Sequence, residues 1–255
     1  MIPEKALAAN IKAKRKNDKA ILNLQRTFCY IVLVLISIIC LFSFYILIIN
    51  STRSHPDIQK GFSMLPGGSL FYNIKNIMSN ENLPVLSGIL NSIFISACVA
   101  VLSTYFSALT AYGIHVYNFK LKKIAYTFIL LIMMVPTQVS ALGFIQLMRS
   151  FSLMDSFVPL IVPSIAAPIV FFFMVKYMES VLPVEIVEAA RIDGAGEFHT
   201  FNRIVLPIMK PALAVQAIFT FVNAWNNYFI PALIINSADK KTLPILMAQL
   251  GARTF

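Results

Sequence analysis

Five apolar segments, each long enough to cross a lipid bilayer, constrain this chain more than any other feature of its sequence. A transmembrane helix needs about 20 mainly apolar residues to cross roughly 30 Å of hydrocarbon. The segments that meet this requirement are Thr27–Asn50, Gly88–His115, Ile124–Met148, Phe157–Met178 and Ala212–Asn236. We therefore predict an all-α fold, a polytopic membrane helical bundle with five transmembrane helices.

The composition agrees with a membrane protein, since 58% of the residues are hydrophobic and 13% are charged, against about 25% charged residues in soluble domains. The net charge of +10 lies in short segments between apolar runs. A nucleic-acid-binding protein needs a solvated basic face instead, so we expect no nucleic-acid partner. Cys29, Cys40 and Cys98 lie within apolar runs without metal-ligand spacing and are predicted to be small buried side chains.

The distribution of basic residues predicts the orientation, because Lys and Arg are retained on the cytoplasmic side. Seven of the 21 precede the first apolar segment, and seven more lie in or next to the loops that are cytoplasmic when this tail is inside. The basic residues of the tail are Lys5, Lys12, Lys14, Arg15, Lys16, Lys19 and Arg26. The expected parts are a cytoplasmic tail (1–26), a first transmembrane helix (27–50), an extracytoplasmic loop (51–87) and a membrane domain (88–255).

Polar residues and prolines mark three of the apolar segments. The second segment carries small hydroxyl side chains on one helical face, which favours close helix packing; they are Ser92, Ser96, Ser103, Ser107 and Thr110. Prolines predict kinks in the third and fourth segments; they are Pro136, Pro159, Pro163 and Pro168.

The fifth segment carries a stripe of four polar side chains, spaced four, three and four residues apart. Such a stripe lines a wet pathway or forms hydrogen bonds between helices, and the residues alone leave both interpretations open. The members of this stripe, our candidates for a translocation path, are Gln216, Thr220, Asn223 and Asn227.

The loop 179–211 is polar and is predicted to hold two short helices. Pro183 suits the start of a helix, and Val184–Ile192 contains no helix breaker. Gly194 and Gly196 then supply a stop, and Glu197–Val205 is expected to form a second helix. The expected apolar face of the first helix comprises Ile186, Val187 and Ala190, and its expected solvated face comprises Glu185, Glu188 and Arg191.

The same loop carries a family resemblance. The sequence EAARIDGAGEFHTFNRIVLPIMKP (188–211) resembles the EAA loop of permease subunits of bacterial ABC importers. The segments NSIFISACVAVLSTYFSALTAYG and FTFVNAWNNYFIPALI resemble the carbohydrate-uptake branch, specifically the second permease of maltose-type transporters. This branch more often has Asp at the position of Asn227 and often has Gly near Leu246, which leaves substrate details open.

The resemblance implies a cytoplasmic coupling helix that docks on an ATP-hydrolysing subunit. It also implies a second permease subunit in a heterodimer, an extracytoplasmic solute-binding protein, a sugar substrate, contact with membrane lipid and a location in the bacterial cytoplasmic membrane. The coupling residues that it implies are Glu185, Glu188, Ala189, Ala190, Arg191, Asp193, Gly194 and Ala195.

Other functional classes fit the sequence less well. The chain has no Gly-Lys pair and hence no phosphate-binding loop, so ATP hydrolysis is expected in a separate subunit. His55, His115 and His199 show no ligand spacing, and neither a cofactor nor a metal is expected. A proton-coupled secondary transporter would carry an ionisable residue at the bilayer midplane, and the sequence places none there. A permease for another solute, such as glycerol phosphate, remains an alternative.

The number of predicted spans gives one further expectation, which concerns the C-terminal end of the chain. Permeases that this chain resembles have a sixth span, whereas five crossings from a cytoplasmic N-terminus leave residue 255 outside. We therefore expect a C-terminally shortened form that lacks the last helix.

Overall fold

The computed structural model describes residues 4–80 and 83–253, and within these ranges the chain forms helices and loops without a strand. Residues 1–3 of the predicted tail lie outside the described part. The chain divides into two compact units, Met1–Ser79 and Asn80–Phe255, which are described separately below. The predicted all-α fold is confirmed.

The first unit is a long helix followed by a small folded cap. Helix α1 (Glu4–Ser51) includes a candidate span over Ile21–Ser51, and α2 (His55–Gln59) and α3 (Leu70–Met78) form the cap. Buried Arg53 holds the turn after α1, because its guanidinium donates to the carbonyl oxygen of Gly61 at 2.9 Å.

The prediction that the cysteines are buried is wrong for two of them. Cys29 and Cys40 are exposed along α1, and Cys98 is half-buried. The reason is that the part of α1 from Ile21 on has almost no buried side chain within its own unit.

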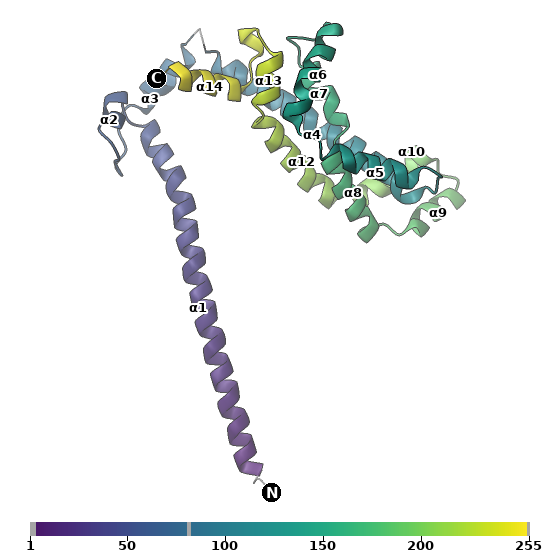
Figure 1. Ribbon diagram of the computed structural model, residues 1–255. Coiled ribbons are helices and arrows are strands. Elements are labelled where there is room, and N and C mark those ends of the chain that lie inside the picture. The colour runs from purple at the N-terminus through teal and green to yellow at the C-terminus, as the bar shows by residue number, and fades with distance from the viewer. Residues whose placement is uncertain (1–3, 81–82, 254–255) are drawn as a thin grey trace. The chain divides into compact units, whose positions relative to one another are not determined.

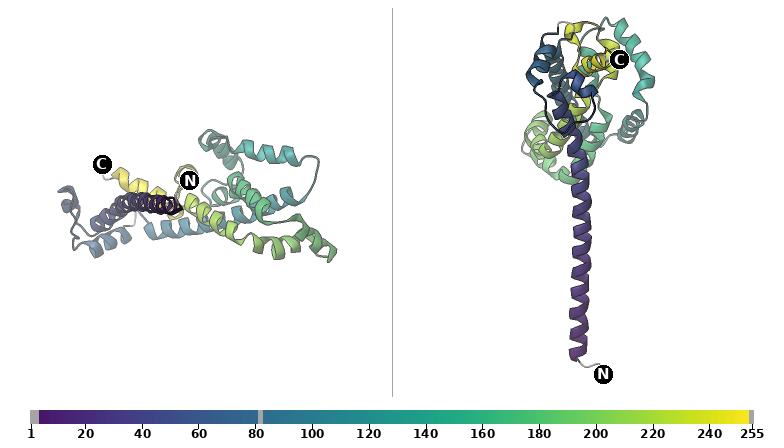
Figure 2. Two further views of the ribbon diagram at one scale, coloured as in Figure 1. Left: turned by 90° about the horizontal axis from the view of Figure 1, so that it is seen from below. Right: turned by 90° about the vertical axis from the view of Figure 1, so that its left-hand side faces the viewer.

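The second unit is built around α4 (Val85–Val116), which packs most extensively against α12 and α8. Helices α9 and α10 lie at one end of this unit and α14 lies at the other (Figure 1, Figure 2). The elements after α4 are α5 (Lys122–Ile132), α6 (Thr137–Ser150), α7 (Val158–Ile161), η1 (Val162–Ile165), α8 (Pro168–Val181), α9 (Val184–Ile192), α10 (Glu197–Thr200), η2 (Phe201–Val205), α11 (Leu206–Ile208), α12 (Lys210–Trp225), α13 (Phe229–Ile234), η3 (Ala238–Lys240) and α14 (Leu243–Arg253).

Three helical stretches in the described residues are long and apolar enough to cross a membrane by themselves, and two bent helix pairs raise the number to five. The three are Ile21–Ser51, Val85–Val116 and Val158–Val181. Helices α5 and α6 form one bent pair, with an angle of 98° between them. Pro136 directly precedes α6, which accounts for the predicted interruption of the third segment.

The fifth predicted segment is not one continuous helix. Helix α12 ends at Trp225, and the chain turns before α13 begins at Phe229. Pro231 explains the break, because its ring would clash with the carbonyl of Asn227 in a continuous helix and its nitrogen has no hydrogen to donate. A second bend of 81° lies before α12, between Glu197–Ile208 and Lys210–Trp225.

The hydroxyl-bearing face of α4 lies in the interior of the second unit. Ser92, Ser96, Ser103 and Ser107 are buried, whereas Thr110 is exposed and donates to the carbonyl oxygen of Phe106, so its predicted place in the stripe is wrong. Small side chains let neighbouring backbones approach closely. The four serines therefore mark the packing face of α4.

The N-terminal end of α4 contacts α14. The backbone N–H of Leu243 donates to Ser92 Oγ at 2.8 Å, and the Asn91 amide donates to the carbonyl oxygen of Lys241 at 3.1 Å. A Cβ atom on Gly88 would lie 2.4 Å from Cδ1 of Leu246, a side chain with no exposed surface. Glycine at position 88 is therefore what allows α14 to approach α4.

We predict that Gly88→Ala lowers the melting temperature of the detergent-solubilised chain by about 2–4 °C, which corresponds to roughly 1 kcal/mol for a chain of this size. The buried Leu246 has to move to make room for the new methyl group. Gly113→Ala is the matched control, since Gly113 lies in the same helix and has nothing within 4 Å of the added Cβ. The control should be neutral or stabilising by up to about 1 kcal/mol, and equal melting temperatures for the two variants would contradict the packing argument.

Candidate functional site

Helix α9 begins and ends at the residues that the loop sequence predicts. It spans Val184–Ile192, and Pro183 precedes it with φ −60° and ψ 135°. At its other end Gly194 has φ +81°, and the N–H of Ala195 donates to the carbonyl oxygen of Ala190 at 2.9 Å. This is a Schellman ending, in which the left-handed residue is usually glycine. The predicted stop is confirmed at Gly194, whereas Gly196 has extended backbone angles and directly precedes α10.

One face of α9 lies in the core of the second unit. Val187 and Ala190 are buried, and Val187 belongs to the same apolar cluster as fully buried Phe201. Ile186 was predicted to share this face but is 37% exposed, because it is turned about 100° from Val187 and lies outside the arc that the core covers. The other coupling residues are exposed, except half-buried Ala195; they are Glu185, Glu188, Ala189, Arg191, Asp193 and Gly194.

Four residues, which we call the Glu197 clamp, connect the end of α9 to α4. Arg191 Nε lies 2.6 Å from Glu197 Oε1, and the Tyr112 hydroxyl donates to Glu197 Oε2 at 2.7 Å. The Arg191 guanidinium also lies over the Tyr117 ring, 5.2 Å from its centroid, at cation–π distance. Glu197 thus receives one donor from α9 and one from α4.

The clamp carries charge at neutral pH. The hydrogen bond from Arg191 is the main cause that lowers the pKa of the Glu197 carboxyl to about 2, so this group stays ionised. The sequence also suggests an ordinary pair between Glu188 and Arg191, three residues apart, but Arg191 pairs with Glu197 instead. Within the described ranges no ion pair includes Glu188, whose side chain is exposed.

The predicted second helix is present but is not a regular α-helix. It runs through α10, a π-helical turn over Phe201–Val205, and α11. Pro207 provides the physical reason, because its missing N–H and its ring prevent the normal α-helical hydrogen bond to the carbonyl of Arg203. The widened turn keeps Phe201 and Val205 buried beneath α9 in one cluster.

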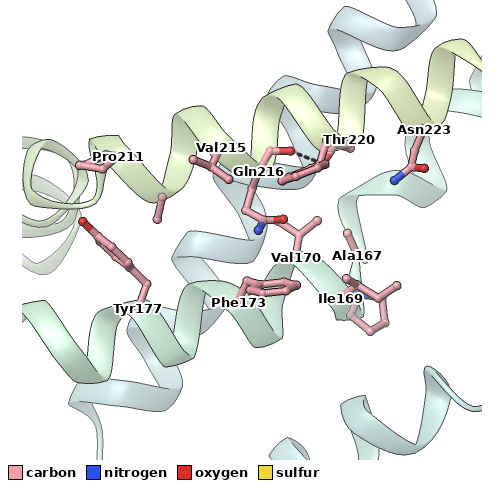
Figure 3. Close-up of a pocket in the computed structure, with 13 residues that line it drawn as sticks. Ala167, Ile169, Val170, Phe173, Tyr177, Pro211, Val215, Gln216, Thr220 and Asn223 are labelled. Carbon is pink, nitrogen blue, oxygen red and sulfur yellow. Dashed lines mark hydrogen bonds between the residues drawn. The ribbon is translucent and has the colours of Figure 1, made fainter. Parts of the chain in front are cut away.

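The predicted polar stripe lies along α12 and the turn that follows it. Gln216 is buried, Thr220 is half-buried, and Asn223 and Asn227 are exposed. Gln216, Thr220 and Asn223 line a cavity of about 670 Å³ between α8 and α12, in which Gln216 points toward Phe173 (Figure 3). The Thr220 hydroxyl donates to the carbonyl oxygen of Gln216 at 2.6 Å. The stripe is therefore buried at Gln216 and becomes exposed toward Asn223 and Asn227.

A second cavity, of about 490 Å³, lies among α4, α6, α7, α12 and α13, and we call it the neutral cavity. Thr220 and Asn223 line both cavities, and Asn227 lines this one. Buried Thr242 also lines it, and its hydroxyl has no hydrogen-bond partner in the described part of the chain. None of its described lining residues is charged; the polar ones are Ser92, Thr137, Ser140, Ser164, Thr220, Asn223, Asn227 and Thr242.

Sequence reasoning missed Glu197 as the partner of Arg191, Tyr112 as a second partner of Glu197, and Thr242 as part of a cavity. Tyr112 is separated from Glu197 by 85 residues, so no local spacing joins them. Thr242 lies in a short polar stretch that looks like an ordinary loop. An interval of six residues between Arg191 and Glu197 across a glycine turn was the only signal available.

Comparisons with known proteins give a family match. Residues 103–254 match the family of binding-protein-dependent transport system inner membrane components. The chain is 41% identical over 160 residues to an arabinooligosaccharides transport system permease protein of Halalkalibacterium halodurans, a match that covers 63% of this chain and 57% of that protein. The chain thus spans little more than half the length of that relative.

Two further matches cover more of both chains. The chain is 32% identical over 220 residues to an sn-glycerol-3-phosphate transport system permease protein of Yersinia pestis, with 84% of this chain and 78% of that protein covered. A solved bacterial ABC transporter involved in the import of the acidic polysaccharide alginate contains a chain with a TM-score of 0.73 at 22% identity. That match covers 89% of this chain and 80% of the other, and it supports the fold. The family match extends over more than half of the sequence, and this chain therefore belongs to the inner membrane components of binding-protein-dependent transport systems.

Proposed function

We propose that this chain is a transmembrane permease subunit of an ATP-driven ABC importer and that it moves a neutral sugar or oligosaccharide across the cytoplasmic membrane. The observation that carries the choice of substrate is the neutral cavity, whose polar lining consists of hydroxyl and amide groups. Such groups exchange hydrogen bonds with sugar hydroxyls without a charged partner.

The related proteins include permeases for arabinooligosaccharides and for sn-glycerol-3-phosphate, so family membership leaves both classes open. A phosphate group in a cavity of low dielectric would require a basic partner. No described residue that lines either cavity on α12 is basic, which favours a neutral substrate. No described lining residue of these two cavities is Asp, Glu or His either, which disfavours a proton-coupled secondary transporter.

The exposed face of α9 is the part that we expect to contact an ATP-hydrolysing subunit. Ile192 at the end of α9 is 86% exposed and Phe198 in α10 is 68% exposed, so this loop offers two large apolar side chains to a partner. The Glu197 clamp and buried Val187 attach α9 to the rest of the second unit. A displacement of α9 by its partner would therefore be transmitted to the C-terminal end of α4.

The opposite end of α4 carries Ser92, which lines the neutral cavity. Movement of α4 as one rigid helix would alter this cavity in step with α9. The remaining partners in this proposal are a second permease subunit and an extracytoplasmic binding protein, with the N-terminus of this chain in the cytoplasm. Coupling between α9 and the neutral cavity requires contacts that differ between the two conformational states of the transporter.

We predict that Gly194→Val reduces uptake about tenfold or more while membrane insertion is unaffected. A β-branched residue at φ +81° costs on the order of 1–2 kcal/mol, which distorts the end of α9. Gly196→Val is the control, because Gly196 has extended backbone angles and nothing lies within 4 Å of an added Cβ. Uptake and membrane content are measured in the same cells; equal uptake by both variants would refute the role of the turn.

We further predict that cysteine at position 223, after replacement of Cys29, Cys40 and Cys98, reacts with a small charged thiol reagent. Its labelling rate should change several-fold when nucleotide is trapped, because Asn223 lines both cavities. Cysteine at position 222 is the control, since Val222 is exposed on the protein but lines neither cavity. A rate at position 223 that is independent of nucleotide would argue for a static polar seam.

A third measurement tests the substrate class. The complete transporter, purified with its partner subunits and binding protein, should show several-fold stimulation of ATP hydrolysis by one of a panel of neutral oligosaccharides. sn-Glycerol 3-phosphate should give no stimulation, because no described residue that lines these two cavities is basic. Stimulation by the phosphate ester alone would overturn the proposal of a neutral substrate.

A further inference from the structure

A basic pocket of about 420 Å³ lies at the C-terminal end of α4, between the turn that leads into α5 and the C-terminal half of α8. Four lysines line it: Lys120, Lys122, Lys123 and Lys176. They come from two segments that are far apart in sequence, so the fold concentrates positive charge in one concavity. Nothing in the proposed transport function requires this pocket.

Most of this charge is not neutralised within the chain. Lys176 pairs with Glu179 at 2.8 Å, and Glu179 is the single acidic side chain among the described lining residues. Lys122 Nζ lies 3.5 Å from the carbonyl oxygen of His115. Lys120 and Lys123 are exposed and take part in no ion pair within residues 4–80 and 83–253. An anion in the pocket would therefore find at least two available ammonium groups.

The backbone and the walls of the pocket add to this preference. No side chain caps the N-terminus of α5, which begins at Lys122, and the N-terminus of a helix attracts anions. The floor is apolar, with buried Ile114 and Val175, and half-buried Tyr126 forms part of the wall. The ligand should thus combine a negative group with an apolar part.

An exposed apolar stripe runs along α5 on the face opposite Tyr126, which lines the pocket. Ile124, Phe128 and Leu131 are spaced four and three residues apart, so they share one helical face, and all three are exposed. The orientation proposed above places the lysine-rich turn at the cytoplasmic surface of the membrane. Anionic lipids are attracted to basic sites on that side.

We propose that this pocket binds the phosphate headgroup of an anionic phospholipid of the cytoplasmic leaflet, with an acyl chain along Ile124, Phe128 and Leu131. Lys120 and Lys123 contact the phosphate, and the N-terminus of α5 adds its partial positive charge. The phosphate occupies the pocket beside the C-terminal end of α4, and the acyl chain covers the outward face of α5.

The test uses the purified full-length chain in nanodiscs that contain phosphatidylethanolamine with a minor fraction of phosphatidylglycerol. Native mass spectrometry then counts the phosphatidylglycerol molecules that remain bound after release from the disc. The double variant Lys120→Gln/Lys123→Gln should retain on the order of tenfold less phosphatidylglycerol than the unmodified chain. Millimolar inorganic phosphate should not displace the lipid, because phosphate alone lacks the apolar contacts.

Arg203→Gln/Lys210→Gln is the matched control, since it removes two exposed basic side chains from the loop 179–211 outside the pocket. Its lipid retention should equal that of the unmodified chain.

Equal losses in both double variants would mean that the lysines attract lipid only through overall charge, and displacement by inorganic phosphate would identify a free-anion site. Either result overturns the proposal, as does the absence of retained phosphatidylglycerol in the unmodified chain. Uptake is not part of the readout, so the outcome is independent of the proposed transport function.

Discussion

The close packing of α4 against α8 and α12 is the interaction on which the second unit depends. Along this helix many of the buried positions are occupied by small residues such as Ser96, Ser103, Ala108 and Ala111, which allow neighbouring backbones to approach. The cost is that the hydroxyls of Ser96 and Ser103 are buried without a hydrogen-bond partner among the described residues. Both cavities, the basic pocket and the Glu197 clamp involve α4 or the helices that pack on it. A change in the position of α4 would therefore reach all of these sites.

The loop 179–211 is attached to this helix by two different kinds of contact. Buried apolar side chains, Val187 and Phe201 among them, give contact that is not directional, whereas the hydrogen bonds of Glu197 specify one orientation of α9. The ion pair with Arg191 is partly exposed and contributes little stability by itself. The ion pair instead helps to fix the orientation of α9, because the single carboxylate of Glu197 contacts side chains from α9 and α4. This combination suits a segment that receives force from a partner.

Charged side chains line the basic pocket but not the neutral cavity, and this difference fits the two proposed ligands. The neutral cavity presents hydroxyl and amide groups, which bind and release an uncharged solute without the desolvation cost of a buried ion. The pocket at the C-terminal end of α4 presents lysines, which suit a ligand that stays bound. A transported substrate must leave its site, and a structural lipid need not.

The sequence by itself determined the membrane class, the approximate positions of the apolar segments and the bounds of α9, because these follow from local properties. Run length sets a span, Pro136 interrupts a helix, and Gly194 tolerates the left-handed backbone that ends α9. Only the tertiary structure decided that Arg191 pairs with Glu197, that Thr110 leaves the packing face of α4, and that Thr242 joins a cavity with residues of α12. These outcomes depend on side chains that come together from distant segments, and neither helical periodicity nor composition carries information about such contacts.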